Sequence, residues 1–149
     1  MRETADSCIV LDVLGIPRAQ ARPRGFVSPG GARVYSPKTP WHTLVQFAAM
    51  ERRARGEICL SGPTRVVMEF RMPRVSGLPK SREIPHTKKP DLDNTAKGTL
   101  DSLVPILLAT DSQVVELVVR KRYALVGEAP GCKIEMTSPS EKMMTVGDD

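Results

Sequence analysis

The chain has 149 residues, of which 22 are Lys or Arg and 17 are Asp or Glu, so its net charge is +5 at pH 7. This length corresponds to about one domain with a buried core. Because no apolar run approaches the ~20 residues of a membrane-spanning helix and the N-terminus lacks a signal-peptide pattern, we expect a soluble, cytoplasmic protein.

The three cysteines, Cys8, Cys59 and Cys132, are widely separated and form no C-x-x-C pair. Their odd number and their spacing exclude a disulfide framework and a zinc site. We expect them to be small buried residues of a protein in a reducing cytosol.

Positive charge is concentrated in two stretches of the chain. Residues 13–50 contain five cations and no anion, and residues 65–90 contain seven cations and two anions. This distribution favours a polyanionic partner such as nucleic acid. The alternative is an ordinary set of solvated lysines and arginines on a mildly basic protein.

Residues 9–14 are mostly apolar and precede Gly15 and Pro17, which predicts a first strand followed by a loop through Arg24. Residues 26–27 and 33–35 surround the turn sequence Ser28-Pro29-Gly30-Gly31 and predict a hairpin. Thr39-Pro40 is typical of a helix start, and the helical spacing continues to Gly56.

The second half of the chain predicts further strands, one helix and a long loop. Residues 64–71 alternate and predict a strand, whereas residues 72–90 contain four prolines and predict a loop. A helix is expected from about Asp93 to Pro105. The remaining expected elements are strands at 114–124 and 133–136, followed by a disordered tail at 138–149.

The most informative feature is a group of acidic residues and one lysine around the expected second helix: Asp91, Asp93, Lys97, Asp101 and Asp111. Two carboxylates one residue apart cannot both be buried without a cation, since each raises the pKa of the other. A hard divalent ion with oxygen ligands would resolve this conflict, and its remaining positions suit water and a substrate phosphate.

Asp111 can return to the start of this helix. A helix of about 11 residues runs ~16 Å from its start, while the seven residues that end at Asp111 can span up to ~23 Å. Asp91, Asp93 and Asp111 would then converge near Lys97, which lies one helical turn from Asp93. Metal-assisted phosphodiester hydrolysis requires such ligands and such a cation.

Two other interpretations fit the same residues. Asp91 and Asp93 could only cap a helix, while Asp93, Lys97 and Asp101 form i,i+4 surface pairs. Residues 91–95 also satisfy D-x-D-x-T, the signature of haloacid-dehalogenase-type phosphatases. That chemistry requires a buried strand before the first aspartate, whereas Pro85-His86-Thr87-Lys88-Lys89-Pro90 stands there.

Several segments together resemble the core pattern of RusA-type Holliday-junction resolvases. They are Gly15-Ile16-Pro17, Arg22-Pro23-Arg24, Lys89-Pro90-Asp91-Leu92-Asp93-Asn94, Lys97, Leu100-Asp101-Ser102-Leu103 and Asp111-Ser112-Gln113-Val114. The chain departs from the family pattern at Thr110-Asp111, where an acidic pair is common, and at Val104-Pro105, where an asparagine-glycine turn is common.

The resemblance implies a small α+β fold, with a mixed β-sheet packed with two main helices, in a homodimer that cuts four-way DNA junctions by paired phosphodiester hydrolysis. It implies Mg²⁺ as the cofactor, with Mn²⁺ as a substitute. It assigns metal binding to Asp91, Asp93 and Asp111 and an essential catalytic role to Lys97. Asp101 also matches the pattern, but helical rotation is expected to turn it away from Asp93, so we consider it a candidate only.

We expect residues 1–137 to form the endonuclease domain. The candidate DNA-binding residues are Arg22 and Arg24, which flank a proline that stiffens their loop, and Lys88 and Lys89, which precede the acidic group. Solvated arginines and lysines are the alternative at these positions. His86 is close enough in sequence to act as a base, but a metal-bound water needs none. The alternative from another function class is a non-catalytic basic DNA-binding protein with structural aspartates.

Overall fold

The structure, a computed structural model, describes residues 8–20, 24–35 and 39–139. Four strands form the main sheet in the order β1 (Cys8–Leu14), β6 (Gly131–Thr137), β4 (Thr64–Met72) and β5 (Val114–Tyr123). β4 and β5 are parallel, and the other neighbouring pairs are antiparallel. The parallel pair is connected through α2 (Leu92–Leu103), as parallel strands require a crossover.

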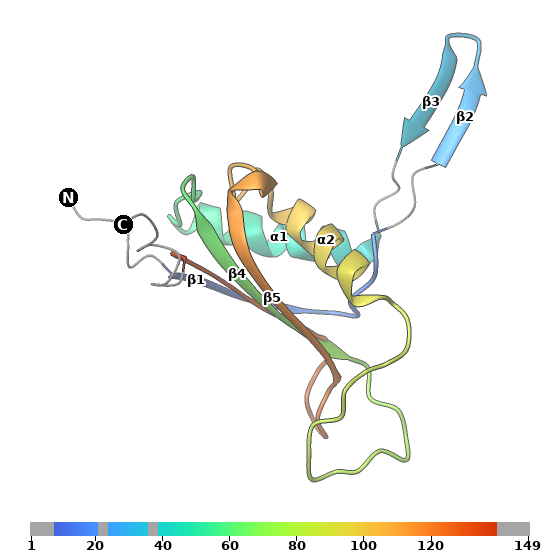
Figure 1. The fold of residues 1–149 in the computed structure, drawn as a ribbon, viewed down its shortest axis with the longest axis vertical. Helices are drawn as coiled ribbons and strands as arrows, with labels where there is room; N and C mark the ends of the chain where they lie inside the picture. The colour runs from blue at the N-terminus through green and yellow to red at the C-terminus, as the bar shows by residue number, and fades with distance from the viewer. Residues whose placement is uncertain (1–7, 21–23, 36–38, 140–149) are drawn as a thin grey trace, which may run out of the picture.

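The core lies between the sheet and the two helices, α1 (Pro40–Ala54) and α2 (Figure 1). Alternate residues of each strand point into it, because successive side chains of a strand face opposite sides. In β4 these are Val66, Met68 and Phe70, which are fully buried. The same alternation leaves Glu69 and its neighbours on the other face partly exposed. The expected α+β fold with two main helices is therefore confirmed.

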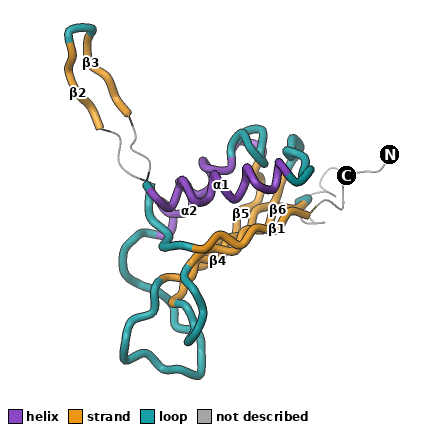
Figure 2. The backbone as a smooth tube through the Cα atoms, turned by 180° about the vertical axis from the view of Figure 1, so that it is seen from behind, coloured by secondary structure: helices purple, strands orange, loops and turns teal. Residues whose placement is uncertain are grey.

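A second, two-stranded sheet consists of β2 (Arg24–Ser28) and β3 (Gly31–Tyr35). This hairpin extends away from the main sheet and the helices, as the view from behind also shows (Figure 2). Gly31 has φ +115°, a conformation that the turn reaches easily with glycine. The hairpin expected around residues 28–31 is present.

Most expected elements agree with the structure to within a few residues, including the long segment between β4 and α2, which contains no helix or strand. Two expectations need correction. Arg24 begins β2 and does not end a loop, because its backbone pairs with Tyr35. Cys132 is buried as expected, but Cys59 is only partly buried, and Cys8 is exposed because it starts an edge strand. Residues 140–149 of the expected tail lie outside the described residues.

Helix α1 begins as its sequence predicts, with the Thr39 hydroxyl accepting from the His42 backbone N–H and Pro40 in the first turn. The next residue, Trp41, is fully buried, and its indole N–H donates to Thr99 Oγ1 at 2.9 Å. Thr99 in turn donates to the Thr95 carbonyl at 2.8 Å. This buried chain of hydrogen bonds fixes the contact between α1 and α2.

The two helices approach closely at Gly98, where a Cβ atom would lie 2.3 Å from His42 Nε2. A side chain at this position would therefore force the helices apart. Burial lowers the pKa of His42, and the Asp101 charge only partly offsets this effect. His42 is accordingly a neutral packing residue at pH 7.

Arg122 of β5 organises the end of the sheet that is farthest from Asp111. Its side chain is 8% exposed and makes two hydrogen bonds to Glu128, at 2.7 and 3.1 Å. Glu69 and Glu83 lie 3.5 and 3.7 Å from Arg122 Nε. The network connects strands β4 and β5 to the loops on either side.

No helix in the described part of the chain is long and apolar enough to span a bilayer.

We predict that Glu128→Gln destabilises the protein in a pH-dependent manner. Hydrogen bonds from Arg122 are the largest cause that lowers the pKa of Glu128 from 4.5 to about 2. The carboxylate therefore stabilises the folded state above about pH 4.5, and this contribution disappears as the pH falls towards 2. Urea denaturation at pH 7 should show a loss of ~2–3 kcal/mol, and the difference from wild type should shrink at pH 3.

Glu51→Gln provides the control, because Glu51 and its partner Arg55 are 64% and 69% exposed. Such a surface pair contributes at most ~1 kcal/mol. Equal stability of the two variants at pH 7 would contradict the assigned role of Glu128.

Candidate metal and nucleic-acid site

A cavity of about 590 Å³ lies between α2 and β5. Its polar lining consists of three carboxylates and one ammonium group, and its apolar floor comes from both elements. The lining residues are Leu92, Asp93, Ala96, Lys97, Leu100, Asp101, Asp111, Leu117 and Val119. Asp93 and Asp111 therefore border the same cavity, although 18 positions separate them in the sequence. The segment that ends at Asp111 is long enough to allow this.

Helix α2 contributes Asp93, Lys97 and Asp101, which are spaced four residues apart and so lie along one side of the helix. Lys97 Nζ is 3.9 Å from Asp101 Oδ2, which is one of the expected i,i+4 pairs. Helical rotation was expected to turn Asp101 away from Asp93, yet both residues line the cavity. Each step of four residues rotates the side chain by only about 40° around a helix, so Asp101 stays on the side of α2 that borders the cavity.

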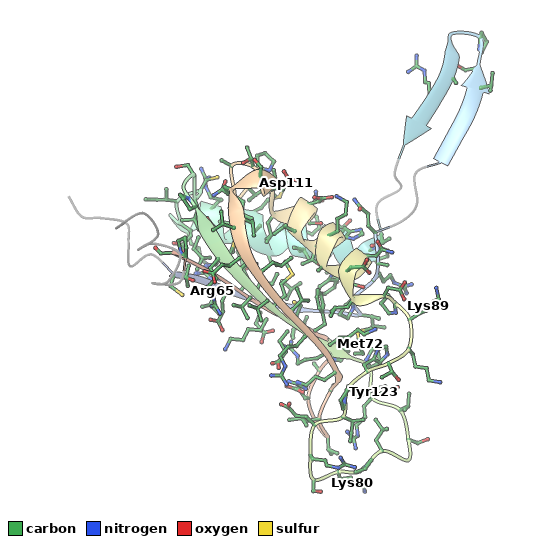
Figure 3. All side chains as sticks on the ribbon, viewed as in Figure 1. Arg65, Met72, Lys80, Lys89, Asp111 and Tyr123 are labelled. Atoms are coloured by element: carbon green, nitrogen blue, oxygen red, sulfur yellow. The ribbon has the colours of Figure 1, made fainter. Side chains whose placement is uncertain are left out.

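Asp111 reaches the cavity on a short 3-10 turn, η2 (Asp111–Gln113), directly before β5 (Figure 3). Gln113 holds this turn. Its Oε1 accepts from the Thr110 backbone N–H at 2.9 Å, and its Nε2 lies 3.0 Å from the Leu60 carbonyl and 3.1 Å from Thr64 Oγ1. The Asp111 side chain itself is exposed. A ligand in the cavity can therefore approach it from solvent.

Asp91 occupies the N-cap position of α2, but its side chain makes no capping hydrogen bond. Its backbone carbonyl instead accepts from the Thr95 N–H at 3.1 Å and from Thr95 Oγ1 at 2.7 Å. The structure thus gives no support to the interpretation that the Asp91 carboxylate serves only as a helix cap. Asp91 is exposed and is not among the residues that line the cavity.

The donor set suits a hard divalent cation. Asp93, Asp101 and Asp111 offer only oxygen atoms, and Mg²⁺ is commonly held by one or two carboxylates together with water and substrate phosphate. Across residues 8–20, 24–35 and 39–139, no three His, Cys, Asp or Glu side chains are already grouped closely enough to hold a metal ion. The fit to such an ion rests on the oxygen donors that Asp93, Asp101 and Asp111 bring to one cavity.

The other predicted residues lie in different positions. Lys88 and Lys89 are exposed in the loop that leads into α2, and Figure 3 shows Lys89 at this junction. Arg22 lies outside the described residues, and only the backbone of Arg24 is described. His86 is half-buried, with its ring centroid 4.7 Å from that of Tyr123. Burial, followed by the Lys121 charge, lowers its pKa, and it does not line the cavity.

Sequence reasoning missed Gln20, which orders the site. Gln20, in the loop after β1, donates from Nε2 to Asp101 Oδ2 at 2.9 Å, and its backbone N–H donates to the Asn94 carbonyl at 3.2 Å. Gln20 thus connects the loop after β1 to both ends of the segment of α2 that carries Asp93, Lys97 and Asp101. No local sequence pattern indicates this, because the partners are more than 70 residues away along the chain.

We predict that Gln113→Leu lowers the free energy of unfolding by ~1–3 kcal/mol, because it removes the hydrogen bonds that join the η2 turn to Leu60 and Thr64 and leaves the Thr110 N–H without its partner. Urea denaturation at pH 7 measures this loss. Ser112→Ala is the matched control in the same turn, since its hydroxyl makes only an exposed 3.2 Å contact with Thr110 Oγ1. A Gln113→Leu variant as stable as the control would show that the turn does not depend on this side chain.

Comparison with known proteins identifies the family of the chain. The chain is 36% identical over 126 residues to a protein described as "Uncharacterized protein YqaN" from Bacillus subtilis (strain 168), an alignment that covers 78% of this chain and 89% of that protein. The family described as Endodeoxyribonuclease RusA matches residues 15–137, which include both helices, the cavity and all but the first strand. The chain therefore belongs to the RusA family of endodeoxyribonucleases.

Proposed function

We propose that this protein is a metal-dependent endodeoxyribonuclease that resolves four-way DNA junctions by paired phosphodiester hydrolysis. The observation that carries the proposal is that Asp93, Lys97 and Asp111 border the same cavity. Family membership supports endonuclease activity on DNA. The carboxylates and the lysine supply what hydrolysis of a phosphodiester needs at such a site.

In this mechanism Asp93 and Asp111, which border the cavity, would hold the metal together with Asp91 at the start of α2. A bound Mg²⁺ or Mn²⁺ ion would supply activation of water and polarisation of the phosphate. Lys97, which is 62% exposed, is free to leave its 3.9 Å contact with Asp101 and to neutralise charge on the scissile phosphate. Asp101, fixed by Gln20, keeps Lys97 close to the cavity until DNA binds.

In this proposal basic residues before α2 and at the β2–β3 hairpin supply the affinity for DNA. Lys88 and Lys89 are exposed immediately before Asp91, where they can contact the phosphates that flank the scissile bond. We include Arg22 and Arg24, which precede and begin the β2–β3 hairpin, in the same DNA-binding set. Phosphate contacts of this kind position the DNA, while the carboxylates carry the chemistry.

We propose that the active species is a homodimer. A four-way junction has approximate two-fold symmetry, and a C₂ dimer presents two equivalent sites to it. β5 is an edge strand of the main sheet, and its Val115 and Val118 are 43% and 41% exposed. Exposed apolar residues on an edge strand favour association with a second copy.

A second candidate function is non-catalytic DNA binding by a basic protein. The net charge of +5 and the exposed lysines at positions 88 and 89 are compatible with it. The two functions differ in one outcome, because only the nuclease converts junction DNA to nicked products when Mg²⁺ is added.

We predict that Asp93→Asn abolishes cleavage of a synthetic four-way junction in Mg²⁺ while junction binding persists or tightens. The substitution removes one anionic ligand without disturbing the cationic surface. Glu135→Gln is the control carboxylate, since strand alternation places Glu135 on the sheet face opposite the core. Mg²⁺-dependent turnover retained by purified Asp93→Asn would remove Asp93 from the site.

The dimer predicts a mixed-subunit effect. When wild type is mixed with excess Asp93→Asn, heterodimers should nick one strand of a supercoiled cruciform plasmid and rarely complete resolution. One nick yields an open circle, whereas two nicks in one binding event yield a linear product. A protein that remains monomeric in light scattering, free and on DNA, yet linearises the plasmid would contradict the dimer.

A further inference from the structure

The long loop between β4 and α2 is tied to β5 shortly before it reaches Asp91. The Tyr123 N–H donates to the Ile84 carbonyl at 2.9 Å, and the His86 N–H donates to the Lys121 carbonyl at 3.2 Å. Figure 3 shows Tyr123 at the end of β5 beside this loop. Residues 84–86 therefore run along the free edge of β5 like a short added strand, with an antiparallel bridge at Pro85.

After His86 the backbone pairing ends, and the Lys121 side chain replaces it. Lys121 Nζ donates to the Lys88 carbonyl at 2.6 Å and to the Pro90 carbonyl at 2.5 Å. Hydrogen bonds from an ammonium group are shorter and stronger than those between neutral groups. One side chain thus holds two carbonyls of the segment that leads into the first aspartate of the site.

The backbone on the other side of Asp91 is held as well, because its own carbonyl accepts two hydrogen bonds from Thr95. The exposed Asp91 carboxylate is therefore carried on a main chain that is fixed at both flanks. Lys121 is half-buried, and strand alternation places it on the same sheet face as Leu117 and Val119, which line the cavity. Burial lowers the pKa of Lys121, while the charge of Asp91 raises it.

β5 consequently connects the segment that carries Asp111 with the segment that carries Asp91. Its first residue follows the η2 turn that carries Asp111, and Lys121, near its other end, holds the segment that carries Asp91. We propose that Lys121 is a positioning residue of the nuclease site: by holding the Lys88 and Pro90 carbonyls, it keeps Asp91 and Asp93 where they and Asp111 can share a metal ion. This inference rests on the proposed function.

The proposal is tested with Lys121→Met, which removes the ammonium group and keeps the length of the side chain. We expect the Mg²⁺ concentration for half-maximal junction nicking to rise about tenfold, because a charge-assisted hydrogen bond that orders the ligands is lost. Binding of Mn²⁺ to the protein without DNA, measured by electron paramagnetic resonance, should weaken by a similar factor. Hydrogen exchange of amides 86–95 should become about tenfold faster, while β4 and β6 remain protected.

Junction affinity in EDTA separates positioning from a direct phosphate contact. A positioning residue leaves this affinity within about twofold of wild type, whereas a residue that binds DNA backbone lowers it. Lys133→Met is the matched control, because Lys133 is a 52% exposed lysine whose partner Glu135 lies on its own strand. In Lys121→Gln the uncharged amide can still donate a hydrogen bond to a carbonyl, so its metal requirement should be intermediate. This variant replaces Lys121→Met in the test if Lys121→Met does not fold.

The outcomes distinguish this inference from the proposed function. Wild type that does not nick junctions in any divalent metal overturns the proposed function, and the Mn²⁺ and hydrogen-exchange measurements then still report on Lys121. If wild type nicks while both Lys121 variants match it in metal requirement, Mn²⁺ binding and exchange, the positioning role is wrong. A defect confined to junction affinity would also overturn it, by reassigning Lys121 to DNA binding.

Discussion

The close contact between α1 and α2 is the constraint on which the rest of the structure depends. The missing side chain at Gly98 lets α2 lie against His42, and the hydrogen bond from Trp41 to Thr99 fixes this contact inside the core. Because Thr95, Ala96 and Thr99 are buried, the charged residues of α2 have only the opposite stripes available. Core packing therefore decides that Asp93, Lys97 and Asp101 border the cavity, although none of them takes part in that packing.

The site combines an apolar floor with carboxylates that remain exposed. In this arrangement the repulsion between the carboxylates is screened by solvent while no cation is bound, so it costs the fold little stability. The ion pair of Lys97 with Asp101 acts in the same direction. A partly open set of ligands also leaves coordination positions for water and phosphate, which a closed cage of protein ligands would not. The proposed nuclease function depends on those positions.

Sequence periodicity predicted the helices and most strands, because burial imposes those patterns locally. The length of the connecting chain predicted that Asp93 and Asp111 can share one region. Periodicity misjudged Asp101, since a helical wheel does not include the width of a cavity or the hydrogen bond from Gln20. The role of Lys121 was likewise not predicted, because its partners are backbone carbonyls of a loop that has no periodicity. Tertiary hydrogen bonds to main-chain groups leave no trace in residue spacing.

Three polar side chains beside the site share one physical role. Gln20, Gln113 and Lys121 each use a long polar side chain to hold backbone or a carboxylate beside the cavity, and none is itself a candidate metal ligand. The turn and the loop that carry Asp111 and Asp91 contain little apolar surface, so packing alone cannot order them. Directional hydrogen bonds can, because each fixes both distance and angle. We infer that in a small domain such bonds hold loop-borne ligands in place, while the core positions the helix.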